Sequence, residues 1–394
     1  MATRSQLFAA LAVLLAAQAA SAKVYVTLRP RLSLMAGYDD NVMLDGRAMD
    51  SYGQAIPGLK LDLFGEHDLR LDLDCQAGIA RLAHPERFGL SSTAFSSNES
   101  CAMSTRGRFS PRDTMRFMAR TTYAQDPFAI AGLGLLLRPG QSQIFVAKVG
   151  LEWEHALSPR SRLDLGSEAQ GLAFQSGDPG NGYLLAPYAR YVYASSLRST
   201  WELTGREQLF FGVGANPNAL APKGAPGGLL DETHAALGGY VYKLTPYADL
   251  SVRGGPLLLT SSRGDRVMPV GRFEIETVTP STALHLTLIH DLMIGPTTAG
   301  PLVGDIAELG WMYEVGHLSG HLRAGIYRNA GVYTQSVGSI GYTGEVAVDW
   351  SLTRELKIGI AGLRDARLND VTIEHQVDRN VVQLRLAWER ARFE

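Results

Sequence analysis

Charged side chains recur at every second position in many short segments of this chain, beginning with Arg29 and Arg31. Successive side chains of a β-strand point to opposite faces, so residues spaced by two share one face. A face that carries arginine and lysine together with aspartate and glutamate attracts water, ions and polar solutes. The chemistry that this spacing offers is the solvation and selection of hydrophilic molecules.

Motifs for covalent or metal chemistry are missing from the sequence, which contains no HExxH, GxSxG, P-loop, CxxC or EF-hand spacing. His317 and His321 flank one short turn, where two histidines are more often exposed turn residues than metal ligands. An enzyme would need a nucleophile or an activated water beside a histidine and a carboxylate. We therefore expect no catalytic residue, no metal site and no cofactor. An enzyme or an adhesin is the least favoured alternative.

Cys75 and Cys101 are the only two cysteines. Both fall on the apolar parity of two predicted strands that are joined by a loop at 83–98. Export to an oxidising compartment would allow them to pair. We predict a cross-strand disulfide, which would stabilise the fold by about 3 kcal/mol in the chain-entropy model. Two separate small thiols are the alternative.

The elements that position these side chains are predicted to be strands. From Val24 the even positions are mostly apolar, and the odd positions up to Ser33 are mostly polar. Leucines alternate with charged residues on both sides of Gly65–Asp68, which predicts a hairpin with a short turn. Seven further short turns follow, most with Ser or Thr before Pro, which favours a tight turn. They lie at 110–113, 158–161, 196–199, 245–248, 279–282, 316–320 and 353–355.

Longer stretches rich in Gly, Pro, Ser and Asp separate the hairpins and are predicted to be loops. They lie at 39–57, 83–98, 126–140, 174–182, 213–230, 254–265, 291–304, 328–337 and 364–377. Eight hairpins, with a first strand at 24–38 and a last at 378–390, give eighteen strands, within a range of 16 to 18. Short turns that alternate with long loops are typical of an outer-membrane barrel. We predict an all-β, transmembrane, antiparallel up-and-down β-barrel with periplasmic turns and extracellular loops.

The two faces of this barrel can be assigned by energy. An arginine near the bilayer midplane costs roughly 2 to 4 kcal/mol on the lipid face, so Arg29 and Arg31 must face the lumen. The same parity predicts as pore-lining Arg29, Arg31, Lys60, Asp62, Arg70, Asp72, Arg106, Arg108, Arg116, Arg120, Arg272, Glu274, Glu276, Glu308, Glu314, Arg323, Glu345 and Asp349. All five tryptophans have the opposite parity, and four lie near short turns, where a periplasmic aromatic girdle is expected. A soluble periplasmic β-protein is the alternative fold.

The two ends of the chain agree with export to the outer membrane. Residues 1–22 combine one arginine, a short apolar run and Ala20-Ser21-Ala22, which predicts a signal peptide. The run is too short to cross the roughly 30 Å of hydrocarbon in a bilayer. Residues 23–394 are then the barrel, in contact with outer-membrane lipids. Such barrels usually end on an aromatic residue, whereas here Phe393 precedes the terminal Glu394.

Three of the predicted loops are unexpectedly apolar, at 128–137, 256–259 and 292–295. Fully solvated loops are usually polar. One interpretation is that the strands extend into these segments, and the other is that the loops fold inward and narrow the pore.

The lumenal charges are predicted to be distributed unevenly. Arginine and lysine predominate in the early strands, and carboxylates predominate from Glu274 to Asp349. On a closed barrel these segments form different walls. We therefore predict a transverse field that orients dipolar or sparsely charged molecules.

The end of the first strand, Tyr38-Asp39-Asp40-Asn41-Val42, resembles a motif of the β-barrel porin family that includes outer-membrane barrels of exopolysaccharide export. The resemblance implies Wzx/Wzy-dependent secretion of a polysaccharide across the outer membrane. It also implies two partners, a periplasmic polysaccharide-export protein and an inner-membrane co-polymerase. Asp39, Asp40 and Asn41 would then lie at the rim, where they either end the strand or contact a sugar or cation.

Two functions remain in the foreground. Exopolysaccharide export is the first, and a general diffusion or solute-uptake porin is the alternative. The net charge of −2 gives no reason to expect a nucleic-acid partner.

Overall fold

The computed structural model describes residues 25–40, 49–65, 68–84, 94–124, 144–174, 182–212, 229–293, 301–333, 338–369, 377–390 and 392–393. The predicted signal peptide lies outside these residues. So do Asn41 and the apolar segment 128–137.

Long antiparallel strands make up nearly all of the described chain. They are β1 (Tyr25–Asp39), β2 (Asp50–Phe64), β3 (Arg70–Leu82), β4 (Ala94–Arg108), β5 (Asp113–Ala124), β6 (Ile144–Ser158), β7 (Ser161–Phe174), β8 (Gly182–Ala194), β9 (Ser199–Gly212), β10 (Leu229–Thr245), β11 (Ala248–Ser261), β12 (Arg266–Val278), β13 (Thr282–Met293), β14 (Leu302–Val315), β15 (Leu318–Gly331), β16 (Gly338–Ser351), β17 (Leu356–Asn369), β18 (Val377–Glu389) and the two-residue β19 (Arg392–Phe393).

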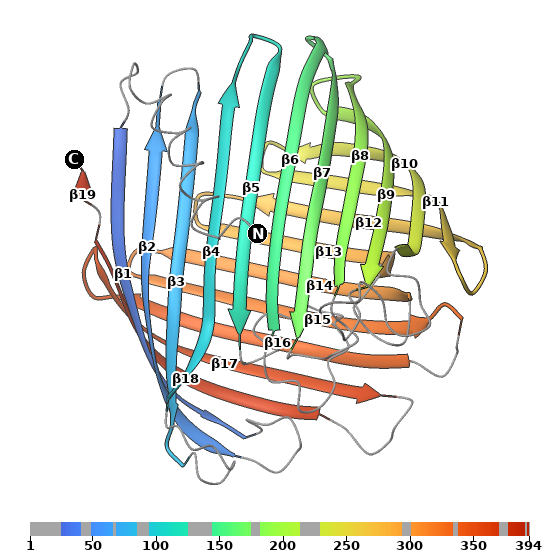
Figure 1. Cartoon of the computed structure of the whole chain (residues 1–394). Helices are drawn as coiled ribbons and strands as arrows, with labels where there is room; N and C mark the ends of the chain where they lie inside the picture. The colour runs from blue at the N-terminus through green and yellow to red at the C-terminus, as the bar shows by residue number, and fades with distance from the viewer. Residues whose placement is uncertain are drawn as a thin grey trace, which may run out of the picture.

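Each strand from β1 to β18 pairs with its neighbours in sequence, and β1 also pairs with β18. The sheet therefore closes into a barrel of eighteen strands, as predicted, with the short β19 beside β1. In Figure 1 the strands β1 to β9 form the near wall, and the later strands cross behind them at a steep angle. This crossing follows from the tilt that strands must adopt when a sheet closes.

The eight short turns predicted from the sequence all join consecutive strands. Hydroxyl groups hold several of them, because the side chain accepts a hydrogen bond from a backbone N–H further along the turn. The Ser110 Oγ accepts from the Asp113 N–H at 3.1 Å, and the Thr279 Oγ1 accepts from the Thr282 N–H at 3.0 Å. Gly316 adopts a φ of +61°, which favours glycine at that turn.

The strands extend further than the predicted loops allowed. The segment 256–259 lies inside β11, and most of 254–265, 328–337 and 364–377 is strand where it is described. The prediction of loops there was wrong because Gly and Pro were read as breaks. In the barrel, Pro256 lies opposite Pro269 of β12 without interrupting the pairing.

The outer face of the barrel is apolar. Leu203, Ile326 and Leu384 are each 60 or 61% exposed and belong to the same face of the sheet as the tryptophans. Trp201 packs against Tyr240 in a tilted arrangement with ring centroids 4.6 Å apart, and the ring centroids of Trp311 and Tyr313 are 5.9 Å apart. Such a surface is stable only against lipid, with aromatic rings near the interface. The protein is therefore a multi-pass barrel of the outer membrane.

No helix among the described residues is long and apolar enough to cross a membrane.

Candidate functional site

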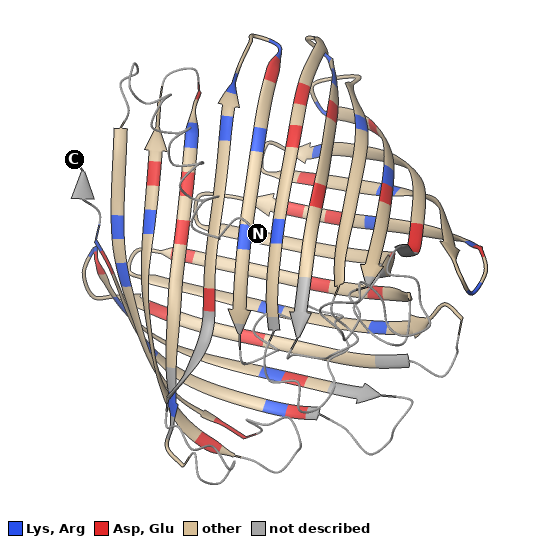
Figure 2. Cartoon of the chain, viewed as in Figure 1, with Lys and Arg blue, Asp and Glu red and all other residues tan. Residues whose placement is uncertain are grey.

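The lumenal face of the barrel carries the charged side chains. Residues that pair across neighbouring strands share a face, and the ladder places Arg29 beside Lys60 and Arg323 beside Glu345. The ladder places the residues predicted to line the pore on the face opposite the exposed apolar residues, such as Leu32, Leu151 and Trp350. Figure 2 shows basic and acidic residues on most of the strands around the barrel.

Ion pairs connect β1, β2 and β3 across the lumenal face. The Arg29 guanidinium binds the carboxylate of Asp62, whose side chain is only 2% exposed. The Arg31 guanidinium binds Asp74 with two nitrogens, one of them 3.1 Å from Oδ2, and it also donates to the Gln76 side chain at 3.2 Å. A buried carboxylate is tolerated only when it is paired in this way.

A second network runs along β5 to β8. Arg116 reaches the carboxylates of Glu152 and Glu154, the latter at 2.8 Å. The Tyr188 hydroxyl donates to Glu152.

Asp164 of β7 is fully buried between two arginines on the same network. Arg162 approaches its carboxylate to 3.1 Å and Arg190 to 2.8 Å. The pairing with two cations compensates for the loss of water around this carboxylate.

The opposite wall is also built from ion pairs. Arg272 binds Glu274 at 2.5 Å, and Arg323 binds Glu308 at 2.9 Å. Arg385 binds Asp349, and the His321 ring lies 3.1 Å from Glu345.

This pairing changes the predicted distribution of charge. Most arginines of the early strands are neutralised by carboxylates of the same wall, so the predicted transverse field is much reduced. Among the described residues, Arg106 and Arg120 on β4 and β5 have no ion-pair partner, nor do Glu276 and Glu314 on β12 and β14. β5 and β14 are nine strands apart in both directions around the ring, so Arg120 and Glu314 lie on opposite walls, and we expect a weak residual field between them.

One corner of the lumen is apolar instead of charged. Leu257 and Leu259 of β11 are 0% exposed and pack with Ala235, Val270 and Leu292 from β10, β12 and β13. Of the two interpretations of the apolar segment 256–259, extension of the strand is the one that the structure shows. The leucines of that strand nevertheless point inward and fill the corner.

A salt bridge crosses the lumen beside this apolar corner. The two terminal nitrogens of Arg206 on β9 each lie 2.9 Å from a carboxylate oxygen of Asp291 on β13. Three strands separate β9 from β13, so the two side chains meet across the corner and not along the wall. The bridge reduces the open cross-section of the lumen. Arg206 has lumenal parity in the sequence, but Asp291 lay in a predicted loop, so the pair was not anticipated.

Asp39 and Asp40 of the predicted rim motif connect β1 to β18, at the seam where the first and last long strands close the barrel. Asp39 is 2% exposed and accepts from Arg379 of β18 at 2.6 and 2.9 Å. Asp40 accepts from both the backbone N–H and the side-chain amide of Asn380, at 2.6 and 2.7 Å. Both aspartates thus connect the first strand to the last.

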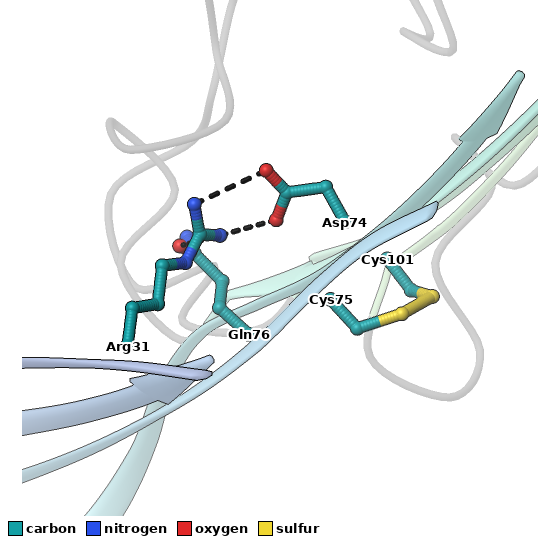
Figure 3. Close-up of a disulfide and its surroundings, with 5 residues drawn as sticks. All are labelled: Arg31, Asp74, Cys75, Gln76 and Cys101. Carbon is teal, nitrogen blue, oxygen red and sulfur yellow. Dashed lines mark hydrogen bonds and ion pairs between the residues drawn. A yellow bond between two sulfur atoms is a disulfide. The ribbon is translucent and has the colours of Figure 1, made fainter. Parts of the chain in front are cut away.

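The two cysteines lie on the outer face. Cys75 and Cys101 are directly opposite in the ladder between β3 and β4 and are joined by a disulfide. Figure 3 shows the disulfide on one side of the strand, and Arg31, Asp74 and Gln76 on the other. The disulfide therefore links the wall of the barrel without entering the lumen.

No protein-family model matches this chain, and no curated protein does. The barrel is similar to several solved structures. One is Pseudomonas aeruginosa OccK2 (OpdF) in complex with glucuronate, with 11% identity, a TM-score of 0.48, and coverage of 93% of this chain and 98% of that chain. Another is P. aeruginosa OccK7 (OpdD), with 9% identity, a TM-score of 0.48, and coverage of 94% and 99%.

The siderophore receptor PirA from Acinetobacter baumannii is a third similar structure, with 8% identity, a TM-score of 0.45, and coverage of 92% of this chain and 80% of that chain. At these identities and TM-scores the likeness assigns neither a ligand nor a function to this chain.

Proposed function

We propose that this barrel is an outer-membrane pore for the diffusion or uptake of small hydrophilic solutes. The observation that supports it most is the lumen itself, whose walls are covered by ion-paired side chains and whose extracellular half is narrowed at one corner. Charged walls keep water in the passage, because the arginines of these pairs, such as Arg29 and Arg162, remain partly exposed even where their carboxylate partners are buried. An eighteen-strand barrel is wide enough for an aqueous channel.

The narrowing favours small solutes over a polymer. Leu257 and Leu259 occupy part of the lumen, and the Arg206–Asp291 bridge closes off the corner beside them. A hydrated polysaccharide chain would have to fit through this narrowed cross-section of the lumen. A small solute needs only a fraction of that cross-section.

Exopolysaccharide export rests on the resemblance at the end of the first strand. Asp39 and Asp40, which carry that resemblance, are already engaged by Arg379 and Asn380. Closing the seam is a sufficient reason for these residues to be there, so they add little support for contact with a polymer. Export with its periplasmic and inner-membrane partners is therefore the second hypothesis.

Reconstitution of the purified protein separates the two functions. In planar bilayers we expect a steady open conductance, and in liposome swelling we expect entry rates that fall steeply from pentoses to trisaccharides. A closed channel that excludes pentoses would contradict the proposal. Deletion of the gene should leave surface polymer unchanged, whereas loss of that polymer would favour export.

A further inference from the structure

Three arginines lie side by side near the periplasmic ends of β3, β4 and β5. Arg70 of β3 is directly opposite Arg106 of β4, which in turn is directly opposite Arg116 of β5. Like charges at directly opposed positions of a sheet repel one another. Anions that lie close to such a row offset the repulsion between its arginines.

Among the described residues, carboxylates pair only with the outer two members of this row. Arg70 binds Asp72 at 2.9 Å, and Arg116 binds Glu154 at 2.8 Å. Arg106, the central member, is exposed to the lumen and has no ion-pair partner in the part of the chain that the structure describes. The central arginine, which has a like charge on both sides, is thus the one without a carboxylate partner among the described residues.

Two more arginines lie below this row, towards the short turn between β4 and β5. Arg108 donates to the Pro111 carbonyl at 3.1 Å, and its nearest carboxylate oxygen, on Asp68, is 3.6 Å away. Arg112 is exposed at the turn and makes no ion pair with any described residue. The excess of positive charge therefore extends from the lumen to the periplasmic rim.

These side chains surround a cavity. Its volume is about 670 Å³, and its lining includes Arg70, Arg106, Arg108, Arg112 and Arg162, with Asp68 and Glu154 as the acidic residues. Cavities of roughly 300 to 1,000 Å³ accommodate small-molecule ligands. The guanidinium group binds carboxylate and phosphate oxygens with two parallel hydrogen bonds.

We propose that this cavity at the periplasmic mouth binds a small polyanion, a free solute that carries two or more carboxylate or phosphate groups. Arg106 and Arg112 provide the charges that no described carboxylate neutralises, and Arg70 and Arg108 flank the bound groups. This binding site is an addition to the proposed passage of solutes, because binding of a polyanion at the mouth does not depend on the direction in which solutes cross the pore. An acidic segment of a periplasmic protein is the competing occupant.

Calorimetric titration of the purified barrel in neutral detergent with citrate, at constant ionic strength, tests the proposal. We expect saturable binding of citrate and none of glycerol. Arg106→Gln should raise the citrate Kd at least about tenfold, because one charge-assisted pair of hydrogen bonds is lost. Arg106→Lys, which keeps the charge but not the fork, should recover part of the affinity.

Arg160 provides a matched control, because it follows Ser158-Pro159 in a turn just as Arg112 follows Ser110-Pro111. Arg160 does not line the cavity. Arg112→Gln should weaken citrate binding, and Arg160→Gln should leave it unchanged. If Arg106→Gln fails to fold, as judged by heat-modifiable mobility on gels, the comparison of Arg112→Gln with Arg160→Gln decides.

Three results would overturn the inference. They are the absence of citrate binding, equal losses for Arg112→Gln and Arg160→Gln, and binding of a hexaglutamate peptide without binding of citrate. The titration is made in detergent solution, so its result does not depend on whether the barrel conducts.

Discussion

The lumenal faces of two regions of the barrel follow the same alternation of side chains but are filled in opposite ways. On β1 to β8 the inward positions carry arginines and carboxylates that pair with one another, as Arg31 does with Asp74. At the corner formed by β10 to β13 the inward positions carry leucines that are completely buried. Inward parity therefore does not by itself mean contact with water.

The difference arises from curvature. Along the gently curved wall of β1 to β8, arginines such as Arg29 and Arg162 stay partly exposed even where their carboxylate partners are buried. At the corner, side chains of four adjacent strands converge, so water is excluded and apolar groups are favoured. The charged wall is expected to govern what passes, and the apolar corner is expected to govern stability and width.

The largest effect on this comparison is expected from Leu257→Ala, in the corner. Removing a fully buried leucine side chain should lower the free energy of unfolding by about 2 to 5 kcal/mol, because it leaves a cavity. Urea unfolding of the barrel in liposomes measures this loss. Leu258→Ala is the control, since Leu258 is the next residue and is 38% exposed on the outer face. Equal losses for the two variants would show that the corner is not a packed core.

Asp164→Asn tests the charged wall. The change leaves Arg162 and Arg190 without the carboxylate between them, and we expect a loss of about 3 kcal/mol, typical of breaking a buried ion pair. Glu168→Gln, which removes a partly exposed partner of Lys148, should cost at most about 1 kcal/mol. The same unfolding measurement applies, and a smaller loss for Asp164→Asn than for Glu168→Gln would contradict the assignment of a buried network.

The bridge between the two regions should affect both width and stability. Arg206→Ala and Asp291→Ala should each raise single-channel conductance, because each opens the corner. A double-mutant cycle should give a coupling free energy of about 1 to 2 kcal/mol, as for residues in direct contact. Arg120→Ala serves as the control for removal of a lumenal arginine without a described partner. An unchanged conductance in Asp291→Ala would argue against the bridge as a narrowing.

The smallest effect is expected from the unpaired charges that face one another across the ring. Arg120→Gln should shift ion selectivity slightly towards cations, and Glu276→Gln should shift it slightly towards anions. Neither should change stability measurably, since exposed charges contribute little. Reversal potentials in a salt gradient report the shifts. Shifts of the same sign would contradict the residual field.

Much of the architecture could be predicted from the sequence, because in a barrel each strand pairs with its neighbours in the chain. Strand count and turn positions follow from local patterns, such as the hydroxyl before Pro111 that holds its turn. Parity was sufficient to place the charged residues on one face and the two cysteines on the other. The alternation is readable because a strand has only two faces, and lipid excludes charge from one of them.

Only the tertiary structure determined which charges are neutralised and where the lumen is narrow. The Arg206–Asp291 bridge joins strands that are not neighbours, so no pattern along either strand indicates it. The bonds of Asp39 and Asp40 to β18 depend likewise on the closure of the ring, which brings the ends of the chain together. A periodic sequence specifies the face of each side chain, whereas contacts across a corner or a seam depend on how the closed sheet bends in space.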